Sequence, residues 1–418
     1  MPPLRWSGEW TAVPDFTALR RDFPILSQEI GGRRLVYLDS AATAQVPLPV
    51  LERVRAHYVC DNANVHRGIH SLSERSTAAY EAARAAAAAF LGAEPEEIIF
   101  TSGATGGINL LAQMFAEQVL RPGDAVITTQ MEHHSNLVPW QEACRRSGAE
   151  LRVAPVTDRG ELDLLALARL LTPEVKLLAI TAVSNLTGTV NPLEAIIPAA
   201  HAVGAAVLVD AAQALRHRRI DVRALGCDFL VFSGHKLCAP GGIGVLYAAR
   251  DRLAQLRPVR FGGGMVDDVT EYEATFSAAP QCFEAGTPNY PAAIGLGAAL
   301  EYLQGIGLDA VAARERELLA AYAGLLGRFP AVHILGAPRE RAGALSFTVE
   351  GASAFDVAVL LDKLGVAVRS GHHCARPLLR RLGADYAVRI SPAFYNDFDE
   401  LEAVEAALRR VFGVLGVR

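Results

Sequence analysis

The sequence has few cysteines and no long apolar run. Its six cysteines are scattered through 418 residues without a Cys-x-x-Cys pair, which disfavours a disulfide framework. No stretch of about 18 uninterrupted apolar residues exists, so no membrane-spanning helix is expected. The N-terminus also lacks the apolar core of a signal peptide. We therefore expect a cytoplasmic protein whose thiols are free.

Charge of one sign is not in excess either. The 40 Lys and Arg residues face 45 Asp and Glu residues, giving a formal net charge of −5. Without a basic patch or a charge block, neither nucleic acid nor a membrane surface is an expected partner. The composition, 51% hydrophobic and 20% charged, is that of an ordinary soluble chain with ample core.

The order of apolar runs predicts an α/β fold. Continuously apolar segments such as 177–183, 206–210 and 229–233 alternate with helical patterns such as 105–120 and 193–203. Strands that are apolar throughout are typical of a mostly parallel sheet that helices cover on both faces. Ligands of such sheets gather at the carboxyl ends of the strands.

The pattern changes after residue 257. Residues 257–289 are rich in Gly, Pro, Thr and Phe, which indicates loops and a hairpin near 261–265, and a second α+β segment follows. We expect an N-terminal arm over 1–32 that packs on the small domain, a large domain over 33–300, and a small C-terminal domain over 301–418.

Two polar residues stand at the ends of neighbouring apolar strands. Asp210 closes the run Val-Leu-Val-Asp, with Gln213 just beyond it, and Lys236 ends Ser-Gly-His-Lys after the next strand. Taken singly, these residues are more typical of a helix cap and a solvated loop. Together they favour pyridoxal phosphate, because a lysine can form a Schiff base with its aldehyde while an acid keeps its pyridinium nitrogen protonated.

A glycine-rich turn at 102–107 follows one expected strand and opens a helix. Free N–H groups and the positive end of the helix dipole make such a turn a phosphate site. It lacks the G-x-G-x-x-G fingerprint, so NAD is disfavoured, and a plain turn is the alternative. Because Ser233 and His235 also lie near a strand end, we interpret Ala104 and Thr105 as a phosphate anchor.

Two further strand ends carry polar side chains. His133, which follows the expected strand 125–128, can stack on a flat aromatic cofactor, ligate a metal, or be a satisfied core residue. Asn185 follows the strand 177–183 and can reach the phenolic oxygen of the cofactor or serve as a turn residue. The cofactor hypothesis favours the first alternative in each case.

A second focus is Arg-Ser-Gly-His-His-Cys at 369–374. The run resembles a zinc motif, but structural zinc needs four ligands with paired spacing, and no partner pair exists elsewhere, so we expect no metal. A cysteine beside two histidines and Arg369 favours a reactive thiolate at Cys374, with an inert buried thiol as the alternative.

Arg389 lies in the apolar run Tyr-Ala-Val-Arg-Ile-Ser. An arginine surrounded by apolar residues in a strand needs an anion as its partner. The carboxylate of an amino acid, held by two parallel hydrogen bonds, is the functional option, and a structural ion pair is the alternative.

Together these motifs resemble one family. The chain resembles the group II cysteine desulfurases of the SufS and CsdA type, within the class V aminotransferase fold of enzymes that use pyridoxal phosphate. The resemblance covers nearly all of the chain beyond the first 20 residues. It implies the aspartate aminotransferase-like fold of these transferases, with a large domain around a mostly parallel sheet and a smaller α+β C-terminal domain. The stretches that carry it are Leu-Asp-Ser-Ala-Ala (38–42), Asn-Val-His-Arg-Gly-Ile-His (64–70), Thr-x-Gly-Ile-Asn (105–109), Met-Glu-His-His (131–134), Val-Ser-Asn (183–185), Val-Asp-x-Ala-Gln (209–213), Ser-Gly-His-Lys (233–236), Phe-Glu-Ala-Gly-Thr-Pro-Asn (283–289), Arg-x-Gly-His-His-Cys-Ala (369–375) and Val-Arg (388–389).

The resemblance implies a role for each candidate residue. It makes Lys236, Cys374 and His133 catalytic, with His133 over the cofactor ring, and it places Asn185 and Arg389 on the substrate. The implied cofactor contacts are Ala104, Thr105, His133, Asn185, Asp210, Gln213, Ser233, His235 and Lys236, with Thr287 contributed by a second subunit. It also implies that His66 and Arg67 approach the cofactor from the partner chain of a homodimer.

The chain departs from the family pattern in places. Ala104 and Gly106 stand where the family has Thr and Glu, and Cys238 and Ala239 follow Lys236 where Tyr-Gly is usual. Backbone contacts to a phosphate do not depend on the first pair, so the reaction class implied by the resemblance is unaffected.

The implied reaction converts L-cysteine to L-alanine. The sulfur passes to Cys374 as a persulfide and then to an acceptor protein of the SufE or SufU kind, for iron–sulfur cluster assembly. Alternatives are a selenocysteine lyase or another C–S lyase that uses pyridoxal phosphate, whose reactions can proceed without Cys374. A binding scaffold in a sulfur-transfer complex is a third possibility, which Lys236 and Cys374 argue against.

Overall fold

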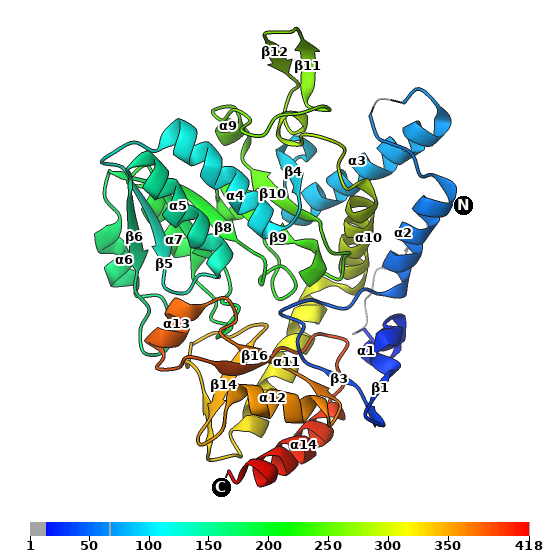
Figure 1. Cartoon of the computed structure of the whole chain (residues 1–418), viewed down its shortest axis with the longest axis vertical. Coiled ribbons are helices and arrows are strands. Elements are labelled where there is room, and N and C mark those ends of the chain that lie inside the picture. Colours follow the sequence, from blue (N-terminus) through cyan, green and yellow to red (C-terminus); the bar gives the residue numbers. More distant parts are fainter. Residues whose placement is uncertain (1–13, 67, 418) are drawn as a thin grey trace.

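The computed structural model describes residues 14–66 and 68–417 (Figure 1). Residues 1–13 of the expected arm and the expected partner contact Arg67 lie outside the described residues. Within the described part, no helix combines the length and the apolar character needed to cross a membrane.

A seven-stranded sheet forms the centre of the large domain, in the order β4-β10-β9-β8-β7-β5-β6. The neighbours from β6 to β9 pair in parallel, and only β10 runs antiparallel to its partners. The expected mostly parallel sheet is therefore confirmed. The strands are β4 (Ile98–Thr101), β5 (Ala125–Thr129), β6 (Glu150–Ala154), β7 (Val175–Thr181), β8 (Ala206–Asp210), β9 (Phe229–Ser233) and β10 (Gly244–Ala248).

Helices cover both faces of this sheet, as Figure 1 shows. Successive strand residues point to opposite faces, so Val207 and Val209 join one core cluster whereas Leu208 joins the other. The helices of this part are α2 (Leu48–Cys60), α3 (Ser71–Leu91), α4 (Ala104–Met114), α5 (Val138–Ser147), α6 (Leu164–Leu170), α7 (Leu193–His201), α8 (Val222–Leu225), α9 (Arg250–Leu253) and α10 (Tyr290–Ile306).

The small domain contains a four-stranded antiparallel sheet in the order β13-β14-β17-β16. The expected strand 366–370 is in fact two short strands, of which β15 leaves this sheet and pairs in parallel with β3 near the N-terminus. The elements are β13 (Val332–Ile334), β14 (Leu345–Val349), β15 (Val366–Ala367), β16 (Arg369–Gly371), β17 (Ala387–Ile390), α11 (Leu308–Leu326), α12 (Ala354–Asp362), α13 (Arg376–Arg381) and α14 (Glu400–Leu415).

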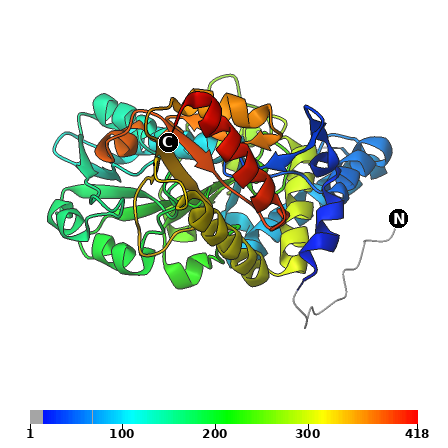
Figure 2. The ribbon, with the colours of Figure 1, turned by 90° about the horizontal axis from the view of Figure 1, so that it is seen from below.

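The N-terminal segment, residues 14–37, contains only short helices and strands, but its side chains pack against the rest of the chain. Its elements are α1 (Phe16–Leu19), β1 (Glu29–Ile30), β2 (Arg33–Arg34) and β3 (Val36–Tyr37). Figure 2 shows this segment beside the C-terminal helix, where Arg20 pairs with Glu400 at 2.8 Å and the ring of Phe23 lies 4.6 Å from that of Tyr395. The expected boundary near residue 300 falls inside α10, and the division into domains stays a prediction.

The hairpin lies slightly later in the chain than expected. Residues 261–265 form a turn, and the paired strands are β11 (Val266–Val269) and β12 (Ala274–Phe276), which project from the top of the molecule in Figure 1. Phe261 and Phe276 stack with ring centroids 5.7 Å apart on the outside.

One buried ion pair fixes the loop that carries Thr287. Arg84 in α3 is 1% exposed and binds Glu284 through both terminal nitrogens, at 2.7 and 2.9 Å. Glu284 also accepts the backbone N–H of Phe100 in β4 at 2.6 Å and the hydroxyl of Tyr80 at 2.9 Å. This carboxylate therefore ties the loop to a helix and to the edge of the large sheet.

Replacing Glu284 with Gln should destabilise the fold. The variant removes the charge of the buried partner of Arg84 and leaves its guanidinium only the more exposed Glu81 as an anion, which costs about 3–5 kcal/mol of unfolding free energy. Urea or thermal denaturation followed by circular dichroism measures the loss. The matched Glu142→Gln removes an exposed pair with Arg145 and should leave stability unchanged, and equal stability of both variants would contradict the prediction.

Candidate active site

The strand ends place an amine beside a carboxylate. β8 ends at Asp210, and the neighbouring parallel strand β9 ends at Ser233, so the turn that carries Lys236 begins at the same edge of the sheet. Burial lowers the pKa of Lys236 to about 8, although the nearby Asp210 acts in the opposite direction. Burial raises the pKa of Asp210, against the effect of Lys236. A lysine with this pKa is partly neutral, and therefore partly nucleophilic, near pH 8.

A cavity of about 210 Å³ opens at this edge and brings the predicted residues together. Every predicted site residue lines it except Thr287, which lines a separate cavity of about 250 Å³ together with His66. Lys236 and Cys374, although 138 positions apart in the numbering, face one space. The lining residues are Ala41, Ala42, Ala104, Thr105, His133, Ser135, Asn185, Asp210, Ala212, Gln213, Ser233, His235, Lys236, Arg369, His373, Cys374 and Arg389.

His133 is held as a neutral ring. Its Nδ1 accepts the backbone N–H of Ser135 at 3.1 Å, so the proton of the neutral imidazole lies on Nε2. Burial, reinforced by the charge of Lys236, lowers the pKa of His133 to about 3. An uncharged, oriented ring suits stacking on a flat aromatic group.

Beneath His133, a buried carboxylate joins two strand ends. Glu132 accepts hydrogen bonds from Thr129 at 2.8 Å, from the backbone N–H of Thr181 at 3.0 Å, and from the amide of Asn136 at 2.6 Å. These bonds link the ends of β5 and β7 and fix the turn that carries His133. Burial raises the pKa of Glu132 to about 8, because desolvation outweighs these three donors.

The glycine-rich turn forms the other end of the cavity. The backbone N–H of Ala104 donates to Ser233 Oγ at 2.8 Å, and the hydroxyls of Thr105 and Ser135 lie 2.7 Å apart. Gly103 has φ of 140°, and a Cβ there would lie 3.2 Å from Ser233 Oγ, so glycine permits the close approach. A helix N-terminus framed by hydroxyls is suited to a phosphate group.

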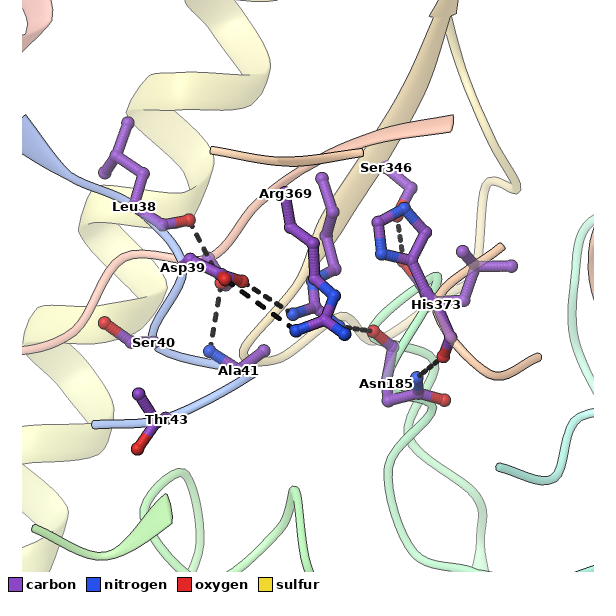
Figure 3. A network of polar contacts seen from close by, with 12 residues as sticks. Leu38, Asp39, Ser40, Ala41, Thr43, Asn185, Ser346, Arg369 and His373 are labelled. Carbon is purple, nitrogen blue, oxygen red and sulfur yellow. Dashed lines mark hydrogen bonds and ion pairs between the residues drawn. The ribbon is translucent and has the colours of Figure 1, made fainter. Parts of the chain in front are cut away.

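Two domains clamp the loop that carries Cys374. His373 and Cys374 both adopt left-handed backbone conformations, with φ of 50° and 52°, which non-glycine residues rarely do. From the large domain, the backbone N–H of His134 donates to Cys374 O at 2.7 Å and Asn185 Nδ2 donates to His373 O at 2.6 Å (Figure 3). The strained turn therefore presents a partly exposed thiol at a fixed place in the cavity wall.

His134, which was not among the predicted residues, completes a cluster with His372 and Cys374. Their ligating atoms lie within 4.8 Å of one another, as in a possible metal site. However, His134 Nε2 accepts the backbone N–H of Arg376 at 3.2 Å, and His372 Nδ1 accepts that of Cys374 at 3.1 Å. A neutral imidazole has one such lone pair, so a metal would have to break both bonds. The cluster instead positions the loop.

Arg389 already has two hydrogen-bond partners within the chain. Its Nη2 donates to Asp39 at 2.8 Å and its Nη1 donates to the backbone oxygen of Asn185 at 3.0 Å. Burial lowers the pKa of Arg389, and Asp39 opposes this effect. Among the described residues, Arg389 Nε and Asn185 Oδ1 are buried without a hydrogen-bond partner. Because buried polar atoms are normally hydrogen-bonded, these two atoms are suited to bind polar groups of a ligand.

The segment 38–43 forms a wall that sequence reasoning did not assign to the site. Gln213 Nε2 donates to Ala41 O at 2.7 Å, and the backbone N–H of Ala44 donates to His235 O at 2.8 Å. Leu-Asp-Ser-Ala-Ala was among the matching stretches, so the signal was present, but its side chains alone indicated no role. The contacts of Ala41 and Ala44 are made by the backbone, which a sequence does not display.

Cys238 does not belong to the reactive groups. It is fully buried with φ of 61°, and burial raises the pKa of its thiol to about 12. Beside it, Arg216 donates to the backbone oxygen of Lys236 at 2.9 Å and pairs with Glu315 of α11. Cys238 is therefore a packing residue under the lysine turn.

The sequence matches the aminotransferase class-V family over residues 36–404. It is 46% identical over 400 residues to a cysteine desulfurase of Dickeya dadantii, covering 95% of this chain and 97% of the relative. It is 48% identical to a cysteine desulfurase of Synechococcus elongatus over 95% of this chain, but spans only 64% of that longer relative. The solved structure of the cysteine desulfurase CsdA (S-sulfonic acid) from Escherichia coli has a TM-score of 0.90 at 37% identity, with 96% of this chain and 100% of that chain covered. The chain therefore belongs to the aminotransferase class-V family and, within it, to the cysteine desulfurases.

Proposed function

We propose that this chain binds pyridoxal phosphate and converts L-cysteine to L-alanine, with the sulfur carried away on Cys374. One observation carries the proposal: Lys236, Asp210, Arg389 and Cys374 face a single cavity. An amine, its counter-acid, a carboxylate-binding cation and a thiol are the groups that this reaction requires.

The cavity fits the cofactor at both ends. Lys236 and Asp210 would hold its aldehyde and its pyridinium nitrogen, and His133 would stack on its ring. Ala104, Thr105, Ser233 and His235 would hold the phosphate, and Asn185, whose Oδ1 has no hydrogen-bond partner in the chain, and Gln213 would contact the phenolic group. When bound, pyridoxal phosphate supplies an electron sink that stabilises negative charge on the α-carbon of an amino acid.

Lys236 is suited to move the α-proton. Its lowered pKa leaves much of the side chain as a neutral amine near pH 8, which can accept a proton on Nζ and return it later in the reaction. Arg389 would hold the substrate carboxylate by the N–H groups that Asp39 and Asn185 leave free.

Cys374 is positioned to accept the sulfur. Its Sγ, as thiolate, would attack the sulfur of the substrate, so that an S–S bond forms while the Cβ–S bond breaks and its electron pair passes to the carbon fragment. Protonation of that fragment gives alanine, and the persulfide stays on Cys374. The short, clamped loop does not reach far, which favours delivery to an acceptor protein of the SufE or SufU kind that docks at the cavity mouth, for iron–sulfur cluster assembly.

A homodimer would complete the site. Thr287 and His66 line a second cavity instead of the first, which supports their proposed role on the cofactor of a partner subunit. Light scattering of the purified protein should give about twice the chain mass of 44.6 kDa. A monomer that turns over at full rate would contradict the shared site.

Replacing Cys374 with Ala should abolish alanine and persulfide formation from L-cysteine while the visible absorption of the bound cofactor persists, because the thiol accepts sulfur but does not hold the cofactor. Alanine is measured by chromatography and persulfide by cyanolysis. The matched Cys60→Ala changes an exposed cysteine and should keep full activity. Sulfide release from L-cysteine by Cys374→Ala at the native rate would show instead that the chain is a C–S lyase.

Cofactor uptake should depend on the protonation of Lys236. Only the neutral amine can condense with an aldehyde, so the rate at which the cofactor-free protein takes up pyridoxal phosphate should rise with pH, with a midpoint near 8. Asp210 raises this pKa, whereas Arg389, Arg216 and Arg369 lower it. Asp210→Asn should therefore move the midpoint to lower pH. Stopped-flow absorption measures the uptake rate at each pH. An unchanged midpoint in this variant would contradict the electrostatic coupling of Lys236 to Asp210.

A further inference from the structure

Asp39 stands behind the arginine that faces the cavity. Arg389 is 3% exposed and lines the cavity, whereas Asp39 is 21% exposed and does not belong to the lining residues. Their atoms Nη2 and Oδ1 are 2.8 Å apart. The guanidinium thus lines the cavity while it is paired with an anion that does not.

The backbone fixes the position of Asp39. It forms a parallel bridge with Ser391, two residues beyond Arg389 in the chain. Ser40 N donates to Ser391 O at 3.0 Å and Ser391 N donates to Leu38 O at 2.8 Å. Ala41 N donates to Ser391 Oγ at 3.0 Å, a network that Figure 3 shows around Asp39. These bonds hold the backbone of Asp39 beside the strand that carries Arg389, so its carboxylate starts from a fixed point within reach of the guanidinium.

A second cavity-lining cation shares this carboxylate. Arg369 Nη1 lies 3.9 Å from Asp39 Oδ2, and Figure 3 shows Asp39 pointing toward this guanidinium. Arg369 is 45% exposed and, as a like charge, lowers the pKa of Arg389. Asp39 therefore offsets the repulsion between two cations that must sit close together.

We propose that Asp39 is a positioning residue for the α-carboxylate of the substrate. It holds Arg389 and Arg369 so that their remaining N–H groups converge on the cavity. The inference rests on the proposed function and deepens it, because it names the residue that sets recognition of the carboxylate. A guanidinium has five N–H donors in a rigid plane, and two of those on Arg389 are already used by Asp39 and Asn185, which fixes the direction of the others.

Removing Asp39 has two opposing electrostatic consequences. The site becomes more positive, which attracts a carboxylate, but Arg389 loses the partner that orients its plane. Recognition by two parallel hydrogen bonds depends on that plane, so loss of orientation should prevail and weaken carboxylate binding. Asp39→Asn separates the contributions, because its amide oxygen can still accept from Arg389 while the charge is lost.

The test compares ligands with and without a free carboxylate. With Asp39→Ala holoenzyme, the dissociation constant of L-alanine should rise about tenfold or more, as expected for loss of an oriented charged hydrogen bond. The constant for L-alanine methyl ester should stay as in the native protein. Both are measured by the change in visible absorption of the bound cofactor, which requires no sulfur transfer. In turnover, KM for L-cysteine should rise more than kcat falls.

Two further variants keep the outcome interpretable. Asp39→Asn should lie between the native protein and Asp39→Ala, and it carries the test if the alanine variant does not fold. Asp397→Ala removes a different aspartate, paired with Arg34 at 3.2 Å and Arg20 at 3.5 Å, and should bind both ligands as the native protein does. Equal weakening of acid and ester, or unchanged or tighter binding of L-alanine by the Asp39 variants, would overturn the inference. Native protein that binds L-alanine but makes none from L-cysteine would contradict only the proposed function.

Discussion

The site depends on the burial of one amine beside one carboxylate. Water would keep both Lys236 and Asp210 in their usual charged forms, but at the carboxyl edge of the sheet desolvation lowers the pKa of Lys236 and raises that of Asp210. The apolar strands that lead to these residues are the cause, since they exclude water from the edge on both faces. The reactivity of the lysine is thus a property of the sheet as a whole.

The second half of the site comes from another part of the chain and is joined to the first by backbone contacts. The thiol loop is bonded to His134 and Asn185 of the large domain, while Arg216 binds both the lysine turn and Glu315 of α11. Lys236 and Cys374 therefore keep their relation through hydrogen bonds that cross between the domains. Hydrogen bonds of this kind are stronger where water is excluded, and Glu315 is buried.

Sequence patterns predicted the elements that are long or strongly periodic. The strands 206–210 and 229–233 have the expected bounds, and the expected helix 193–203 is α7, which ends two residues earlier at His201. Elements that depend on tertiary contact were missed or misplaced. β3 and β15 have two residues each and exist because they pair with each other. α13 has six residues, of which Leu378 and Leu379 pack with Met131 and Leu186. Neither gives a periodic signal.

The same distinction applies to the site. Lys236, Asp210 and Cys374 could be found because their side chains carry chemistry and stand in recognisable motifs. His134 and Asp39 could not, since the role of each follows from a contact with a residue more than 200 positions away. The sequence contained a partial indication of Asp39, because Arg389 in its apolar strand requires an anion. It did not indicate which acid supplies that charge.

The stretch 36–44 runs from β15 to the lysine turn. β3 pairs with β15 at one end, and the backbone N–H of Ala44 donates to His235 O at the other. This stretch lines one side of the site and also connects β15 to the turn that carries Lys236. Proteolytic trimming that spared every catalytic side chain but cut within this stretch would still dismantle the pocket. The early part of the chain is accordingly a poor place for a cleavable tag or a fusion joint that intrudes beyond residue 35.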